Sequence, residues 1–102
     1  MSDWLDIAAI EEVPFGTKKA FQTPYEPIVI VNLEGEFYAL QDLCTHDGGI
    51  LSNGWLEKAD LVCPRHGAHF SVKTGEALTA PAYEPINTFP VKIEQGRIMV
   101  KI

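Results

Sequence analysis

The sequence has no long hydrophobic run, few basic residues and only two cysteines, and these shortages narrow the classes of protein to which it can belong. No segment approaches the ~20 consecutive apolar residues that a membrane helix needs, so no membrane span is predicted. Eight Lys and Arg against fourteen Asp and Glu give a net charge of −6, which makes nucleic acid a poor partner. A chain of 102 residues is long enough for one domain, which we expect to span 1–102.

Motifs typical of enzymes are missing as well. The chain has no nucleophile elbow, no phosphate-binding glycine loop and no dinucleotide fingerprint, so we do not expect an enzyme. The first residues, Met-Ser-Asp-Trp-Leu-Asp, are acidic where a signal peptide would be basic. Together with so few cysteines, this predicts a cytoplasmic protein, which we expect to be a monomer.

The two cysteines are concentrated with two of the three histidines in two short segments. These segments are Cys44-Thr45-His46 and Cys63-Pro64-Arg65-His66, and sixteen residues separate them. Two thiols and two imidazoles suit either a tetrahedral zinc ion or a [2Fe–2S] cluster with one Cys₂ iron and one His₂ iron. The interleaved order Cys–His, Cys–His favours the cluster, because common zinc fingers place both cysteines before both histidines.

Both segments resemble the motif of the Rieske family, Cys-x-His followed 15–17 residues later by Cys-x-x-His. The similarity continues through the flanking residues Asp47-Gly48-Gly49 and Gly67. The resemblance implies one Rieske [2Fe–2S] cluster as cofactor, with Cys44 and Cys63 on one iron. His46 and His66 would bind the other iron through Nδ1. It further implies an antiparallel β-sandwich in which residues 43–70 form a small inserted cluster-binding subdomain.

Departures from the family pattern point to its low-potential branch. Gly49 and Arg65 stand where high-potential Rieske proteins have two further cysteines, so no bracing disulfide can form. Ala68 and Phe70 stand where those proteins have Ser and Tyr hydroxyls that donate hydrogen bonds to cluster sulfurs. The loss of these donors lowers the reduction potential. The sequence therefore resembles the ferredoxin component of bacterial aromatic-ring-hydroxylating dioxygenase systems.

Such a ferredoxin is an electron carrier. The resemblance implies that it accepts electrons from a flavoprotein reductase that uses NAD(P)H and passes them to a terminal Rieske non-haem iron oxygenase. Three alternatives stay open: a small subunit of a nitrite reductase complex, a carrier for another redox partner, and a zinc-stabilised interaction module. The sequence does not identify the final substrate.

The pattern of apolar residues predicts an all-β fold. Two hairpins are expected, 27–33 with 36–40 around Glu34-Gly35, and 91–94 with 97–102 around Gln95-Gly96. Further turns are predicted at Asn53-Gly54 and at 73–75, while 7–13 suits either a short strand or a helical turn.

Four other residues invite interpretation. His69 could pair with Cys63, but the family spacing favours His66, which leaves His69 as a strand or surface residue. The role of Arg65 stays open. Trp55 and Tyr83 are interpreted as packing groups, because small β domains need large side chains in their cores.

Overall fold

A computed structural model describes residues 4–44, 49–64, 67–80 and 82–102. It contains ten strands in three antiparallel sheets and no α-helix within these ranges, which confirms the all-β prediction. No helix in the described ranges is long and apolar enough to cross a membrane. The elements are β1 (Trp4–Ala9), η1 (Ile10–Glu12), β2 (Lys18–Phe21), β3 (Ile28–Leu33), β4 (Glu36–Gln41), η2 (Leu51–Asn53), β5 (Trp55–Glu57), β6 (Asp60–Val62), β7 (His69–Ser71), β8 (Thr88–Phe89), β9 (Val91–Glu94) and β10 (Arg97–Lys101).

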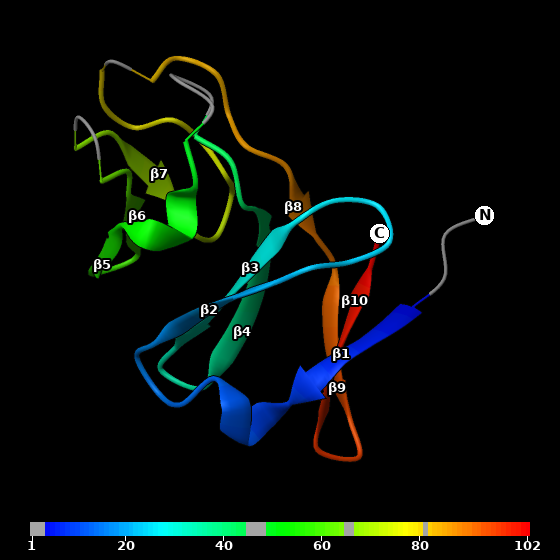
Figure 1. The fold of residues 1–102 in the computed structure, drawn as a ribbon. Helices are drawn as coiled ribbons and strands as arrows, with labels where there is room; N and C mark the ends of the chain where they lie inside the picture. Colours follow the sequence, from blue (N-terminus) through cyan, green and yellow to red (C-terminus); the bar gives the residue numbers. More distant parts are fainter. Residues whose placement is uncertain (1–3, 45–48, 65–66, 81) are drawn as a thin grey trace.

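Two of the sheets form the base of the molecule. One has the strand order β1-β10-β9, and the other has the order β2-β3-β4-β8 (Figure 1). Both predicted hairpins are present, as β3–β4 and β9–β10. Glu34 and Gln95 have φ angles of 51° and 50°, and a glycine with positive φ follows each of them. Both turns therefore have the left-handed backbone conformation that matches the right-handed twist of the strands they join.

Strand β3 is buried on both of its faces. Ile28 and Ile30 pack with Ile98 and Val100 of β10. The alternate residues Val29 and Val31 belong to a second buried cluster, which also contains both cysteines. Because side chains alternate across a strand, β3 separates these two cores, and this explains its continuous run of β-branched residues.

The third sheet, β5-β6-β7, lies beside the base at one end of the molecule (Figure 1). Its strands are short and pair in sequence order, Trp55 opposite Val62 and Val62 opposite His69. A long segment then runs from this sheet back to β8 in the base. The third sheet and the loops around it fall within and just beyond residues 43–70.

Candidate metal centre

Both cysteines lie at the start of a loop and are fully buried. Cys44 follows β4 after two intervening residues, and Cys63 directly follows β6. Each has an exposure of 0%, and the two are not joined in a disulfide. They belong to the same continuous buried cluster, so the fold brings two residues from distant parts of the sequence to one place.

Backbone hydrogen bonds close each loop behind its cysteine. The Cys44 N–H donates to the Gly49 carbonyl at 2.9 Å, and the Cys63 N–H donates to the Ala68 carbonyl at 2.8 Å. The Gly67 N–H donates to the Cys63 carbonyl at 3.1 Å, and Gly67 has a φ of +71°, which favours glycine. His46, Arg65 and His66 lie outside the described residues. Among the residues that the structure does describe, no three His, Cys, Asp or Glu side chains come together as a metal site.

The segment after β7 also contributes side chains to the buried cluster. Ala82 and Ile86 are 2% and 3% exposed and pack in the cluster that contains the cysteines. The Leu78 N–H donates to the His69 carbonyl at 2.8 Å, and the Ile86 N–H donates to the Gly75 carbonyl at 2.9 Å. These contacts fix the segment against β7 and the turn that follows it, on both sides of residue 81.

His69 lies on β7, between two carboxylates. Its Nδ1 is 3.0 Å from Asp60 Oδ2, and its Nε2 is 3.8 Å from Glu57 Oε2. Trp55 Nε1–H donates to the same Glu57 oxygen at 3.1 Å. Both ring nitrogens of His69 therefore face carboxylates on β5 and β6, which supports the interpretation of His69 as a strand residue.

The donor set fits a [2Fe–2S] cluster. Two buried thiols come from two loops, as a cluster held between opposed loops requires, and burial protects them from competing oxidation. Ala68 and Phe70, also 0% exposed, pack in the same cluster of side chains as the cysteines. The described part of the site thus has no hydroxyl at either position.

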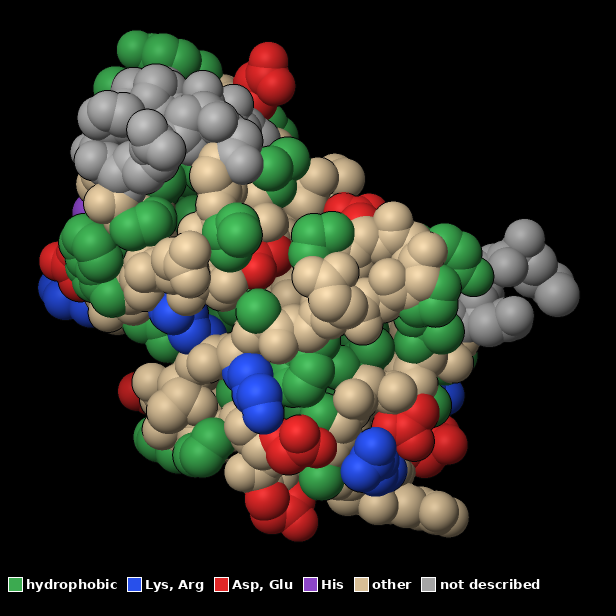
Figure 2. All heavy atoms as spheres, in the orientation of Figure 1, with side chains coloured by type: hydrophobic (Ala, Val, Ile, Leu, Met, Phe, Trp, Pro, Cys, Tyr) green, Lys and Arg blue, Asp and Glu red, His purple; other side chains and the backbone are tan. Residues whose placement is uncertain are grey.

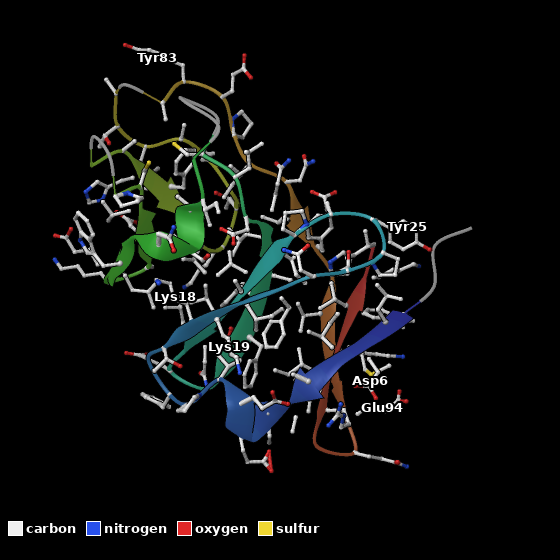
Figure 3. The ribbon with its side chains drawn as sticks, in the orientation of Figure 1. Asp6, Lys18, Lys19, Tyr25, Tyr83 and Glu94 are labelled. Atoms are coloured by element: carbon white, nitrogen blue, oxygen red, sulfur yellow. The ribbon has the colours of Figure 1, made fainter. Side chains whose placement is uncertain are left out.

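One interpretation of the sequence is wrong. Trp55 and Tyr83 were expected to pack in the core, but they are 48% and 83% exposed. The core needs neither of them, because aliphatic side chains and Phe70 fill it. Figure 3 shows Tyr83 pointing outward from the end of the molecule that holds the third sheet.

Comparison with known proteins gives a consistent result. The family model described as "Rieske [2Fe-2S] domain" matches residues 3–90. A ferredoxin component of the naphthalene 1,2-dioxygenase/salicylate 5-hydroxylase systems of Ralstonia sp. is 39% identical over 98% of this chain and 96% of the relative. The ferredoxin component of a 2,4-dinitrotoluene dioxygenase system from Burkholderia sp. (strain RASC) is 40% identical, with the same coverage of 98% and 96%.

Solved structures share the fold over almost the whole chain. The ferredoxin of Sphingomonas yanoikuyae B1 superposes with a TM-score of 0.92 at 30% identity, and the match covers 98% of this chain and 99% of that one. A chain in the complex of reduced oxygenase and oxidized ferredoxin in carbazole 1,9a-dioxygenase gives a TM-score of 0.88 at 32% identity. That match covers 95% of this chain and 91% of that chain.

Proposed function

The chain belongs to the Rieske [2Fe–2S] domain family, and we propose that it is the ferredoxin component of an aromatic-ring dioxygenase system. The observation that carries this proposal is that ferredoxin components of such systems match nearly the whole chain. When bound, a Rieske cluster supplies reversible one-electron transfer. The protein is then an electron carrier and not an enzyme.

We propose Cys44, His46, Cys63 and His66 as the four ligands. The burial of both thiols and the loop closure behind each cysteine support the two sulfur ligands. The imidazole ligands are assigned from the sequence motif, since both histidines lie outside the described residues. Within a single domain of residues 1–102, a cluster-binding subdomain of about 43–70 follows from this assignment.

The proposed partners are a flavoprotein reductase and a terminal oxygenase. The solved complex of oxygenase and ferredoxin in carbazole 1,9a-dioxygenase supports the second partner, since one of its chains shares this fold. A monomeric carrier in the cytoplasm fits both partners, and two thiols that form no disulfide suit that reducing compartment.

Metal and sulfide analysis tests the cofactor directly. Protein purified anaerobically should contain about two iron and two acid-labile sulfide per chain. The reduced protein should give a rhombic electron-resonance signal with a low average g value. It should also reduce the oxygenase of a naphthalene dioxygenase system when NADH and that system's reductase are supplied. Stoichiometric zinc without sulfide would refute the proposal.

Single substitutions test the ligand set. Cys44→Ser, His46→Ala, Cys63→Ser and His66→Ala should each abolish or cripple cluster incorporation, because each removes a proposed ligand and the chain has no other cysteine to substitute. His69→Ala is the matched control and should retain iron and sulfide. Loss of the cluster in His69→Ala, with retention in His66→Ala, would reverse the assignment in the second loop.

A further inference from the structure

Asp42 is a buried carboxylate that sequence analysis did not single out. It is 4% exposed, and it is the only buried charged residue among those that the structure describes. Its Oδ1 accepts a hydrogen bond from the Ser52 N–H at 2.6 Å, and its Oδ2 accepts one from the Ser52 hydroxyl at 2.6 Å. Burial of a carboxylate is costly unless hydrogen bonds compensate, so this pair meets a specific need of the fold.

The pair joins the two ends of the first cysteine loop. Asp42 precedes Cys44 by two residues, and Ser52 lies in η2, next to Leu51, which packs in the same buried cluster as Cys44. The two hydrogen bonds therefore close residues 43–51 into a ring, outside the smaller ring made by the Cys44–Gly49 bond. We name this Asp42–Ser52 pair the loop clasp.

Two further contacts hold the loop clasp against the base. Lys18 of β2 donates from Nζ to the Ser52 carbonyl, and η2 lies against β2. Figure 3 shows Lys18 on the side of β2 that faces η2. On the other side, the Asp42 N–H donates to the Pro27 carbonyl at 3.1 Å. The loop that begins at Cys44 is thus fixed to the four-stranded sheet at both of its ends.

We propose that Asp42 and Ser52 are positioning residues that hold the first ligand loop in its cluster-binding conformation, and that the buried charge of Asp42 lowers the reduction potential. This inference depends on the proposed function, because it concerns how a cluster is held. The clasp acts through the backbone, since closing both ends of a loop limits its local opening. The charge acts because a negative group in a low-dielectric interior disfavours the addition of an electron.

Four substitutions separate the two effects. Asp42→Asn keeps the shape and can hydrogen-bond Ser52 in both places, since its amide oxygen accepts and its NH₂ donates. It removes only the charge, so the potential should rise while iron content stays at the wild-type level. Asp42→Ala removes both hydrogen bonds of the clasp, whereas Ser52→Ala removes only the one from the hydroxyl, since the N–H of residue 52 still donates to Asp42 Oδ1. Ser52→Ala should accelerate loss of iron to excess chelator about tenfold, because a hydrogen bond to a charged group is lost, and Asp42→Ala should accelerate it further. Ser52→Thr keeps the hydroxyl and should restore retention.

Thr23→Ala is the matched control. The Thr23 hydroxyl bridges a loop of the base, accepting from the N–H groups of Tyr25 and Glu26 and donating to the Glu26 carbonyl. Its removal should leave the rate of iron loss and the electron-resonance spectrum unchanged, although it costs local hydrogen bonds.

The measurements are iron loss followed by visible absorbance, electron resonance of the reduced protein, and the midpoint potential. Altered g values in Ser52→Ala with native circular dichroism would show that the loop itself has shifted. Wild-type retention and g values in both Asp42→Ala and Ser52→Ala would overturn the positioning role, and an unchanged potential in Asp42→Asn would overturn the charge effect. If the wild-type protein contains no iron and sulfide, the proposed function is wrong. If the wild-type protein contains both and the variants behave like it, only the proposal about Asp42 and Ser52 is wrong.

Discussion

At Gly54 the backbone around the site leaves no space for a side chain. A Cβ built there would lie 1.7 Å from the Val62 carbonyl oxygen and 3.2 Å from Pro64 Cδ. The φ of Gly54 is −81°, so the position needs glycine for space and not for a left-handed conformation. Because Val62 and Pro64 flank Cys63, a larger residue at position 54 must displace the strand end that carries this proposed ligand.

We expect Gly54→Ala to lower the free energy of unfolding by about 3 kcal/mol, the upper end of the cost of overpacking. It should also reduce the iron bound per chain. Gly96→Ala is the control, because its Cβ meets nothing within 4 Å and only the φ of +74° is strained, at a cost of about 1 kcal/mol. Urea denaturation of both variants provides the comparison. Equal losses of unfolding free energy in the two variants would mean that the close approach between Gly54 and the Val62 carbonyl can relax.

Ala68 and Phe70 give a prediction about potential at the same scale. Both side chains are fully buried beside the cysteines and have no hydroxyl, so the wild-type midpoint should lie near the lower end of the roughly −150 to +300 mV Rieske range. The double variant Ala68→Ser, Phe70→Tyr should raise it, because each new hydrogen bond to sulfur stabilises the reduced form by up to ~3 kcal/mol. Cyclic voltammetry measures both values. An unchanged midpoint would show that these hydroxyls do not reach the cluster.

At the scale of elements, strand β10 illustrates how the sheet β1-β10-β9 contributes to stability. Ile98 on β10 is 0% exposed and packs against Ile28 and Ile30, while its cross-strand neighbour Ile93 on the edge strand β9 is 46% exposed. Ile98→Ala should cost about 2–5 kcal/mol, as expected for a cavity in a close-packed core. Ile93→Ala removes the same atoms from a half-exposed site and should cost less than about half as much. Thermal unfolding of both variants tests this ranking, and similar losses would contradict it.

The sequence predicted those elements whose determinants are local. The β3–β4 and β9–β10 hairpins follow from turn residues that accept positive φ between β-branched runs. The segment 7–13 combines both predicted forms, because β1 ends at Ala9 and the 3₁₀ turn η1 follows at Ile10. The pairing of β1 with β10 joins opposite ends of the chain, and no local pattern encodes it. Strand β2 was also missed, since its residues Lys18–Phe21 lie at a sheet edge and alternate poorly.

The site shows the same division between local and long-range information. The spacing of the Cys–His segments is a local signal, and it identified two cysteines that the fold buries together. The Asp42–Ser52 hydrogen bonds connect residues ten apart with no diagnostic motif. Asp42 is buried among contacts with Ser52 and Pro27, and sequence pattern gives neither these contacts nor the exposure of Tyr83.

For the whole molecule, we expect charge to steer the encounter with partners. The chain has a net charge of −6, and acidic side chains are spread over the face shown in Figure 2. A protein of this charge is attracted over long range to basic surfaces, and salt screens that attraction within ~10 Å at 0.1 M. We therefore expect the second-order rate of oxygenase reduction to fall as ionic strength rises. Stopped-flow measurements over a salt series test this, and a rate independent of salt would contradict steering by charge.

We expect short-range contact with the oxygenase to depend on exposed side chains near the buried cysteines. Tyr83 is 83% exposed, while its neighbour Ala82 is buried in the cluster that contains Cys44 and Cys63. A tyrosine held outward by a buried neighbour presents a large contact area at a low cost in entropy, as interface residues do. Tyr25 is also 69% exposed, but it lies in the β2–β3 loop of the base, away from the third sheet (Figure 3).

Tyr83→Ala should therefore slow electron transfer to the oxygenase about tenfold or more, the effect of losing one interface anchor. The iron content, midpoint potential and unfolding free energy should stay unchanged, because an exposed side chain contributes little to the core. Tyr25→Ala removes an equally large side chain from the base and should transfer electrons at the wild-type rate. Stopped-flow reduction of the oxygenase distinguishes the two variants. If both slow transfer equally, or neither does, contact with the oxygenase does not depend on the surface beside the cysteine loops.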